Sequence, residues 1–495
     1  MNPIPPIALL AVLPAVALGQ FRPDIPKAWN EEALAAMTLP LAGLSAPIKY
    51  APADWYYRIP ERVIYRGYPV YLPNREPHNY LNFLSAQEPE VVFDASKMNT
   101  ESDWLRGGES VFSSGDRFDL LTVDDIHDLA LWEKFRFRAD ADGSLPGWRY
   151  VIRKKGKVEL ASTLCGGCHE REVDGNTVAG PASTAAIGAP PVFVTRRRMR
   201  FAQNWDKTAQ QLVQREFTLF SVPWRDPDPA AMVAKLTAPQ IFAIYEALPS
   251  GVVARSGTSL FFPPKIPDLI GVKDRKFLGA TGLHRHLGIA DLMRYAILET
   301  GIADYSQYGE VRPMGELPDP ARLSRLSDAQ AYALALYIYS LKPPANPNRL
   351  DTTAKRGQKI LEREGCATCH PPPLYTNNRL APVDGFRVPD ERRKKYDVMD
   401  VVADTDPRLA LETRVGSGYY RVPSLKGVRY RAPFEHNGSL ATLEDMFDPM
   451  RLRDNYVPTG LKEYGVENRP VKGHAYGVKL SFEEREALLA FLHTL

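Results

Sequence analysis

The chain has 495 residues, of which 44% are apolar, so it can bury at least two hydrophobic cores and form two or three domains. Its 62 Lys and Arg residues nearly balance 59 Asp and Glu residues, and the net charge of +3 argues against nucleic acid as the main partner. The 43 prolines predict long fixed loops around a modest number of helices.

The first stretch of the chain, residues 1–19, is typical of a secretory signal peptide. An apolar run from Ile7 to Leu18 is followed by Gly19, a small residue suited to signal-peptidase cleavage. The run is short for a bilayer span, and no later stretch is apolar enough to cross a membrane. The basic residues that usually precede such a run are missing, so a membrane anchor is the alternative. We expect a periplasmic or otherwise exported protein with no membrane span after signal removal.

Residues 20–101 are rich in aromatic residues and prolines and predict an extended, loop-rich arm that wraps around the rest of the chain. We assign no chemistry to this arm. Further along, WRYVIRKKGKVEL (Trp148–Leu160) alternates apolar and polar residues around Lys155-Gly156. This alternation predicts a small β-hairpin.

All four cysteines lie in two copies of one motif, Cys-x-x-Cys-His. The copies consist of Cys165, Cys168 and His169 in the first, and Cys366, Cys369 and His370 in the second. A helical turn places both sulfurs on one face beside the histidine, which suits thioether bonds to a haem and a proximal iron ligand. A redox dithiol would not need the histidine, and a zinc ribbon would have its cysteine pairs about 15–20 residues apart. The motifs therefore predict two covalently bound haem c groups.

A second repeat indicates that each motif belongs to its own module. LSDAQAYALALYIYSL (326–341) aligns without gaps on LSFEEREALLAFLHTL (480–495), and both begin with a capping box before apolar residues at helical spacing. Each follows one Cys-x-x-Cys-His, as the last helix of a cytochrome c module follows its haem-attachment helix. The alternative is two unrelated amphipathic helices. KPPANPN (342–348) predicts an extended linker, because prolines disfavour helix.

The predicted fold is mainly α-helical, with two cytochrome c-like domains that each carry one covalent haem. Domain 1 (residues 102–341) would bind haem 1 through the first motif. Domain 2 (residues 349–495) would bind haem 2 through the second. The N-terminal arm and the small β-hairpin complete the predicted architecture.

The segment YRVPSLKGVRYRAPFEHNGSLATLEDMF (Tyr420–Phe447) resembles the C-terminal signature of the bacterial di-haem cytochrome c peroxidase superfamily. This superfamily also contains the di-haem enzymes that mature tryptophan-derived quinone cofactors and the latex-cleaving rubber oxygenases. The resemblance covers Arg356–Leu495. It implies that one haem is six-coordinate and transfers electrons, while the other keeps an open face for hydrogen peroxide or dioxygen.

The resemblance implies two candidates for the sixth ligand of haem 2. Met450 lies fourteen residues after His436, where the peroxidases carry an axial methionine. His474, in KGHAYGVKLS, resembles a Gly-His-x-x-Gly segment of rubber-oxygenase-like relatives, which use a second histidine. We favour His474, since Met450 could be packed in the core. His436 would then line the haem without binding its iron.

For haem 1 the resemblance implies an open face. The position of the peroxidases' distal histidine, sixteen residues after His169, is Ala185, and no histidine occurs from residue 170 to 283. His284 and His286 could supply a distal acid–base group or, alternatively, a loop hydrogen bond. The peroxidases' distal glutamate has no clear counterpart, with Glu216 as a candidate.

Three further features are compared with the superfamily. Trp205, in QNWDKTAQQL, resembles the tryptophan near which electrons pass between the haems, with Trp224 as the second candidate, and either could simply be core. The basic run Thr195–Arg200 could face haem propionates or an acidic donor protein, or be a solvated charged face. The superfamily's calcium is doubtful here, because Arg431 replaces its motif threonine, although backbone carbonyls could still serve.

These observations predict an exported, peroxidase-like di-haem oxidoreductase with a catalytic haem 1 and an electron-transfer haem 2. Its expected partners are hydrogen peroxide or dioxygen together with a small redox donor protein, a cytochrome or a cupredoxin, or an organic substrate. The alternatives are a plain di-haem electron-transfer cytochrome and a rubber-oxygenase-like dioxygenase.

Overall fold

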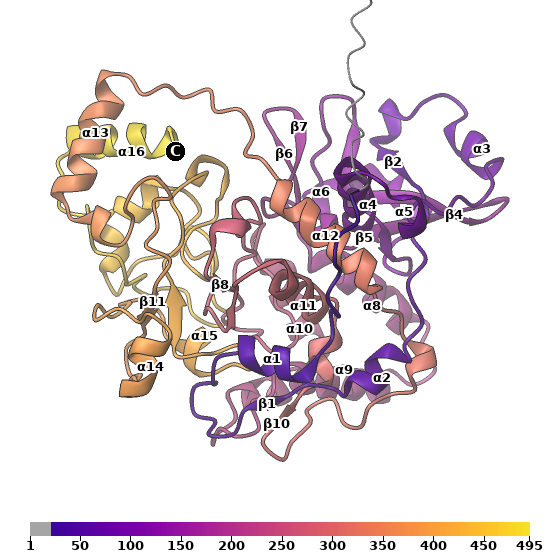
Figure 1. Ribbon diagram of the computed structural model, residues 1–495, viewed down its shortest axis with the longest axis horizontal. Helices are drawn as coiled ribbons and strands as arrows, with labels where there is room; N and C mark the ends of the chain where they lie inside the picture. Colours follow the sequence, from indigo (N-terminus) through magenta and orange to yellow (C-terminus); the bar gives the residue numbers. More distant parts are fainter. Residues whose placement is uncertain (1–20) are drawn as a thin grey trace, which may run out of the picture.

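The computed structural model describes residues 21–495, so the predicted signal peptide lies outside the described residues. The chain is mainly helical, with short strands between the helices (Figure 1). The helices before the linker are α1 (Glu31–Met37), α2 (Ala53–Tyr57), α3 (Tyr80–Ser85), α4 (Glu101–Phe112), α5 (Val123–Ile126), α6 (Leu129–Lys134), α7 (Gly166–His169), α8 (Ala189–Arg200), α9 (Trp205–Phe220), α10 (Ala238–Ala247), α11 (Ile289–Glu299) and α12 (Asp328–Ser340). The helices after it are α13 (Thr352–Arg363), α14 (Asp390–Lys395), α15 (Arg408–Leu411) and α16 (Phe482–His493). Within residues 21–495, no helix combines the length and the apolar composition needed to cross a bilayer.

The strands form small antiparallel sheets. The largest sheet has the order β2-β4-β5-β3 and consists of β2 (Gly67–Tyr71), β4 (Ser144–Lys154), β5 (Lys157–Thr163) and β3 (Gly115–Arg117). The remaining strands form two-stranded pairs: β1 (Ile48–Lys49) with β10 (Gln307–Tyr308), β6 (Glu170–Val173) with β7 (Asn176–Ala179), β8 (Phe277–Leu278) with β9 (His284–Arg285), and β11 (Leu380–Pro382) with β12 (Tyr419–Arg421).

The predicted hairpin at Trp148–Leu160 is confirmed. Strands β4 and β5 pair antiparallel up to Lys154 and Lys157, and Gly156 in the turn has a φ of +80°, which glycine adopts without steric cost. The sheet is larger than predicted, because β2 and β3 add one strand to each side. This sheet forms one hydrophobic core with α6, in which Trp132 is buried.

The N-terminal segment differs from the expected extended arm, because residues 21–101 contain three short helices and add a strand to the largest sheet. Trp29 and Tyr56 are buried and stacked, with ring centroids 4.7 Å apart, and the Trp29 indole donates to the Ala51 carbonyl at 2.8 Å. They share a core with residues of α11 and α12. The abundant aromatic side chains therefore contribute to the core instead of wrapping over it.

The two predicted repeat helices are confirmed as α12 and α16. Each begins with the expected capping box, in which Ser327 pairs with Gln330 and Ser481 with Glu484. The side-chain hydroxyl of each serine accepts the N–H three residues later. The caps satisfy backbone groups that would otherwise lack a partner at the start of each helix.

Each repeat helix packs against a helix that precedes the corresponding motif, α12 against α4 and α16 against α13. A Cβ atom on Gly108 of α4 would lie 2.0 Å from the Ala333 carbonyl oxygen, and one on Gly357 of α13 would lie 1.8 Å from that of Ala487. The gapless alignment of the repeat places Ala333 on Ala487. The two helix pairs thus cross at equivalent positions, and each crossing requires a glycine.

Residues 342–348 have no regular structure and run from α12 to α13 across the top of the molecule in Figure 1. The side chains of Asn346 and Asn348 donate to the carbonyl oxygen of His493 at 2.9 and 3.2 Å. Arg429 donates to the carbonyl oxygen of Ala345 at 2.6 Å. The linker segment is therefore held against the C-terminal part of the chain.

Candidate functional site

The first Cys-x-x-Cys-His motif follows β5, where the chain enters the short helix α7. The N–H groups of Cys168 and His169 donate to the Cys165 carbonyl oxygen at 3.1 and 2.9 Å, so a single turn carries all three side chains. Burial raises the pKa of the Cys165 thiol to about 12 and lowers the pKa of His169 to about 4. At pH 7 the motif therefore presents uncharged thiols and a neutral imidazole, which is the form that binds a metal.

Glu170 fixes the first motif to the β4–β5 hairpin. Its buried carboxylate accepts hydrogen bonds from the Gly147 N–H at 2.7 Å, the Ser113 hydroxyl at 3.0 Å and the Arg149 guanidinium at 3.1 Å. The sequence analysis did not identify this residue, although its place directly after the motif was a possible signal. The contacts tie the chain at the end of the first motif to the hairpin and to the end of α4.

The second motif begins where α13 ends. Gly365 has a φ of +76°, which ends the helix, and the 3₁₀ turn η7 (Cys366–Thr368) follows. The N–H groups of Cys369 and His370 donate to the Cys366 carbonyl oxygen at 3.2 and 2.9 Å, the same pattern as in the first motif.

The imidazole of His370 has a defined free nitrogen. Its Nδ1 lies 3.1 Å from the Tyr375 carbonyl oxygen. Because a carbonyl oxygen only accepts, Nδ1 carries the proton and Nε2 keeps its lone pair. A histidine held through one nitrogen in this way binds a metal through the other.

His474 lies opposite His370. The two ring centroids are 6.1 Å apart, with an interplanar angle of 57°. Imidazole nitrogen binds a transition metal at about 2 Å, so two imidazoles on opposite sides of one ion bring their centroids to about 6 Å. His474 is an exposed residue of the chain, while partial desolvation of its ring lowers its pKa, with the nearby His370 and Arg451 acting in the same direction. The spacing of the two rings therefore matches that of two imidazoles bound to one iron.

Arg451 anchors the segment that carries His474. It lies in the 3₁₀ turn η10 (Pro449–Leu452) and is fully buried. Its guanidinium donates to the carbonyl oxygens of Met446, Val471 and His474 at 2.9, 2.6 and 2.8 Å. His474 itself has a φ of +49°, in the left-handed region that a side chain rarely adopts. The sequence analysis missed Arg451, because no local pattern marks a contact across 23 residues.

The other two residues predicted around haem 2 have different surroundings. The side chain of Met450 is 42% exposed. His436 stacks on Tyr420 with ring centroids 4.4 Å apart, and its Nδ1 lies 3.5 Å from the Thr405 hydroxyl. Burial lowers the pKa of His436 to about 4. Of the two predicted sixth ligands, His474 contacts the ring of His370, whereas the side chain of Met450 is exposed.

The two histidines predicted near haem 1 differ in their hydrogen bonds. His286 is engaged through both ring nitrogens, with Nδ1 2.7 Å from the Arg275 carbonyl oxygen and Nε2 2.6 Å from the Tyr339 hydroxyl. His284 is engaged through Nε2, 3.3 Å from the Tyr50 hydroxyl. Its ring meets that of Tyr295 edge-on at 5.4 Å, and burial lowers its pKa to about 3. His286 therefore has a structural partner on each side, and His284 is neutral at pH 7.

Three further candidates make no hydrogen bond or ring contact with either motif within residues 21–495. Trp205, the first residue of α9, is 45% exposed. Trp224 stacks on Tyr308 with ring centroids 5.2 Å apart. Glu216 is buried and accepts a hydrogen bond from the Tyr245 hydroxyl at 2.7 Å, and burial raises the pKa of its carboxyl.

The basic run on α8 is matched by acidic side chains. Arg196, Arg197 and Arg198 form ion pairs of 2.8, 2.8 and 3.3 Å with Glu246, Asp125 and Asp119. Arg196 and Arg197 are about two-fifths exposed and Arg198 is more exposed. Three arginines of the run are therefore paired with acidic side chains of this chain.

Backbone carbonyls in the segment after Arg429 are held by cations of the chain itself. Arg171 donates to the carbonyls of residues 430 and 432 at 2.7 and 3.2 Å, and Lys265 donates to those of residues 431 and 433 at 2.7 and 2.5 Å. In the described part of the chain, no three His, Cys, Asp or Glu side chains are grouped to hold a metal ion. The carbonyls of residues 430–433 therefore have hydrogen-bond donors from the chain itself.

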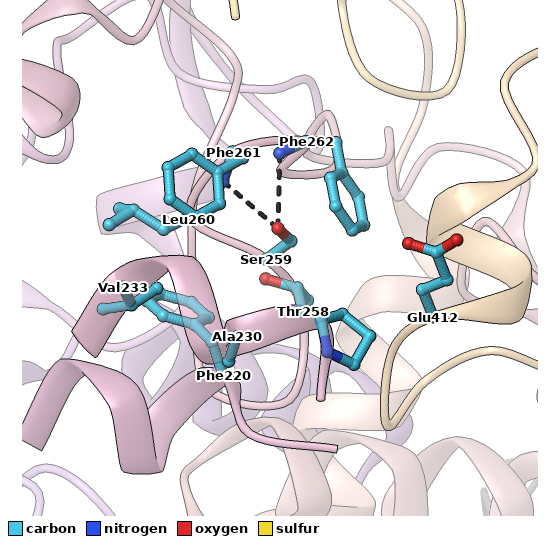
Figure 2. A pocket seen from close by; sticks show the side chains of 10 residues that line it. Phe220, Ala230, Val233, Thr258, Ser259, Leu260, Phe261, Phe262 and Glu412 are labelled. Atoms are coloured by element: carbon cyan, nitrogen blue, oxygen red, sulfur yellow. Dashed lines mark hydrogen bonds between the residues drawn. The ribbon is translucent and has the colours of Figure 1, made fainter. Parts of the chain in front are cut away.

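A small pocket lies between the 3₁₀ turn η3 (Pro229–Lys235) and the loop of residues 258–262 (Figure 2). The Ser259 hydroxyl accepts the N–H groups of Phe261 and Phe262 at 3.1 and 3.3 Å, and Glu412 reaches the pocket from the opposite side. None of its lining residues belongs to either motif. Its polar groups are therefore mostly engaged in holding the loop.

Comparison with known proteins gives partial matches. No protein-family model matches the chain. It is 26% identical over 166 residues to cytochrome-c peroxidase IdrP1 of Pseudomonas sp. (strain SCT), across 30% of this chain and 41% of that protein. It is 30% identical over 145 residues to the methylamine utilization protein MauG of Methylorubrum extorquens, across 29% of this chain and 34% of that protein. The chain thus spans less than half the length of these curated relatives.

Among solved structures, the chain is similar to a MauG-like protein associated with microbial copper homeostasis. The TM-score is 0.30 and the sequence identity is 17%, and the match covers 59% of this chain and 89% of that chain.

Proposed function

The chain belongs to the di-haem cytochrome c peroxidase superfamily, and from this we propose that it is an exported oxidoreductase in which haem 1 is the reaction centre and haem 2 transfers electrons. The observation that carries the proposal is the difference between the two motif histidines. His370 faces a second histidine at 6.1 Å, whereas His169 has no ring contact with another histidine within residues 21–495. Ligation alone would then close one iron and leave the other open.

Two cytochrome c-like domains, at residues 102–341 and 349–495, would each hold one haem. Two observations support this division. The helix pairs α4–α12 and α13–α16 cross at equivalent glycines, and both motifs have the same backbone hydrogen bonds. The cysteines would form the thioether bonds, and the motif histidines would bind the irons. The bound haems supply the redox chemistry with peroxide, and the protein sets which haem takes part.

At haem 2, His370 and His474 would be the axial ligands. The Tyr375 carbonyl holds the proton on Nδ1 of His370, and Arg451 holds the backbone of His474. His436 would line the haem beside Tyr420. Because both axial positions are filled, this haem would exchange electrons and not bind peroxide.

At haem 1, the polar side chains that we assign to the reaction pocket are His284 and Tyr295. The rings of His284 and Tyr295 meet edge-on with centroids 5.4 Å apart, and the positive charge of Arg255 acts on the pKa of both and on that of His169. Burial raises the pKa of Tyr295, so its hydroxyl keeps the proton at pH 7 and can donate a hydrogen bond. The neutral His284 has one ring nitrogen that is not bonded to Tyr50. These two groups would orient a small oxidant.

Peroxide-dependent oxidation of a reduced donor tests the proposal. A reduced small cytochrome or cupredoxin should be oxidised when hydrogen peroxide is added to the haem-loaded protein. Replacing His284 by Gln should lower kcat/KM about 10²-fold, the loss of a positioned acid–base group. His286→Gln is the comparison, because His286 is held by two other partners and should affect mainly stability.

Two outcomes would favour the other functions. Oxygen uptake with cleavage of an organic substrate, and negligible turnover with peroxide, would indicate a rubber-oxygenase-like dioxygenase. No reaction with either oxidant, together with reversible electron exchange, would indicate an electron-transfer cytochrome. The apolar run at residues 7–18 is the basis for export, and detection of the haem-stained protein in a periplasmic fraction would test it.

A further inference from the structure

Five cationic side chains come together between the first motif and the C-terminal part of the chain. We call them the cationic centre: Arg171, Lys265, Arg275, Arg421 and Arg431. Asp268 is the carboxylate that they share, since it lies 3.4 Å from Arg431 and its charge acts on the pKa of the other four. All five cations are partly buried and share this one carboxylate, so positive charge exceeds negative charge within the cluster. Partly buried charge without a partner is costly.

Three members of the cationic centre each bind two backbone carbonyls. Arg171 and Lys265 bind the carbonyls of residues 430–433. Arg431 donates to the carbonyls of residues 424 and 426 at 2.7 and 2.8 Å. Their role is therefore to hold the loop that precedes His436.

Arg275 and Arg421 have unused hydrogen-bond donors. Arg421 donates through Nε to the Gly279 carbonyl at 2.8 Å, and its two Nη groups bind nothing within residues 21–495. Arg275 donates through Nη2 to the Ile270 carbonyl at 2.9 Å, and its other donors are likewise unused in the described chain. Burial lowers the pKa of Arg421 to about 9 and of Arg275 to about 10.

Arg275 and Arg421 are both partly buried, and a guanidinium with free donors in such a place is stabilised when an anion faces it. Carboxylates match guanidinium geometry, because two parallel N–H groups can bind their two oxygens. Arg275 donates to the Ile270 carbonyl, and the adjoining Leu269 N–H donates to the Gly180 carbonyl at 2.9 Å. The Gly180 N–H in turn donates to the His169 carbonyl at 2.7 Å, so the free donors of Arg275 lie close in the fold to the first motif. A haem carries carboxylate side chains, and haem 1 would bring them to this environment.

We propose that Arg275 and Arg421 form a binding site for the carboxylate side chains of haem 1. This inference rests on the proposed attachment of a haem at His169. The two arginines would compensate the negative charge of those carboxylates and so stabilise the reduced state of haem 1.

Spectroelectrochemical titration of the haem-loaded protein tests the site in phosphate-free buffer. Arg421→Gln and Arg275→Gln should each favour the oxidised form of haem 1 about tenfold at pH 7, equal to 59 mV for a one-electron couple. The carboxylate pKa should rise without its cation, so the potential of the variants should depend on pH in the weakly acidic range where the parent is flat. Arg421→Lys keeps the charge and should restore most of the shift.

Arg414→Gln is the matched control. Arg414 is more deeply buried than Arg275 and Arg421, and its guanidinium is used by the carbonyls of Thr218, Leu219 and Ser221 at 3.2, 2.9 and 2.6 Å. Its loss should lower stability and leave the potential of haem 1 unchanged. If the two Gln variants leave the potential and its pH dependence unchanged, the proposed site is wrong.

Inorganic phosphate distinguishes haem carboxylates from a free anion. If the haem carboxylates fill the site, adding phosphate to the parent protein should not change the potential of haem 1. A saturable shift that disappears in Arg421→Gln would show a free-anion site and overturn the proposal. Haem-stained gels separate the two levels of inference, since absence of haem 1 refutes the proposed function, while its presence without these shifts refutes only the carboxylate site.

Discussion

The regions around the two motifs share a scaffold and differ at the face opposite the motif histidine. In residues 102–341 and 349–495 alike, a glycine-dependent helix crossing accompanies a turn in which two N–H groups bind the first cysteine carbonyl. Opposite His370 stands His474, held by the buried Arg451. Around His169, by contrast, the charged neighbours that act on its pKa are Asp268, Arg255 and Arg275.

This difference teaches how one fold can give two functions. The attachment turn and the helix crossing depend on local hydrogen bonds and close packing, which both regions keep. His474, the proposed second ligand of haem 2, lies in a loop, and a loop can change without disturbing the helices. Changes that remove a feature of one haem region should show how the two regions differ. The largest expected effect comes first.

The largest effect should follow from removing a cysteine pair. Cys165→Ala with Cys168→Ala should leave one haem per chain, because the thioether bonds of haem 1 can no longer form. Cys366→Ala with Cys369→Ala should likewise remove only haem 2. Haem-stained denaturing gels measure both results, and retention of two covalent haems in either double variant would refute the attachment.

Replacing His474 by Ala should convert haem 2 from low-spin to high-spin, because its sixth ligand is lost while His370 remains. Electron paramagnetic and near-infrared spectra would record the change. Met450→Ala is the matched control and should leave the spectra unchanged, since its side chain is 42% exposed. A methionine-to-iron band that disappears in Met450→Ala would reverse the assignment.

Replacing Arg451 by Gln should loosen the segment that carries His474 while both proposed ligands of haem 2 remain. Three backbone carbonyls, one of them buried, would lose charge-assisted hydrogen bonds, which we expect to cost about 2–4 kcal/mol in the free energy of unfolding. Part of haem 2 should become high-spin, because the segment of His474 is no longer held. Arg453→Gln, at an exposed position nearby, is the control and should change neither quantity.

The loss of protein stability at acid pH should show a smaller effect, which depends on His284 near haem 1. The pKa of His284 is lowered to about 3 in the fold, so below the ordinary histidine pKa of about 6.5 the unfolded chain binds a proton that the native chain does not. This difference should remove about 2 kcal/mol of stability when the pH falls from 8 to 5.

His284→Gln should therefore reduce the loss of stability between pH 8 and pH 5, as measured by denaturant unfolding at each pH. The exposed His78 is the control, and His78→Gln should keep the acid sensitivity of the parent. Equal acid sensitivity in His284→Gln and the parent would show that His284 titrates normally in the fold.

Local patterns predicted much of the scaffold and only part of the site. The capping boxes at Ser327 and Ser481 and the alternation around Gly156 correctly predicted α12, α16 and the β4–β5 hairpin, because these features depend on neighbouring residues. The segment of residues 21–101 was expected to be extended, because its short helices are fixed by tertiary burial of side chains such as Trp29.

Most residues that distinguish the surroundings of His169 from those of His370 are not marked by any local sequence pattern. Arg451 and Arg421 carry no motif of their own, and their roles depend on carbonyls brought near by the fold, at His474 and Gly279. His474 was a candidate through a short resemblance, and its distance from His370 depends on the tertiary structure. Periodicity cannot specify such contacts, because they join segments far apart in the chain.

Carbon monoxide titration of the fully reduced, haem-loaded protein tests the central claim most directly. Carbon monoxide binds a reduced haem iron that has an open axial position. It does not bind an iron whose two axial positions are both held by histidines. The account predicts one carbon monoxide bound per two haems, rising to two in His474→Ala. Binding to both haems of the parent, or to neither, would contradict the division into an open haem 1 and a closed haem 2.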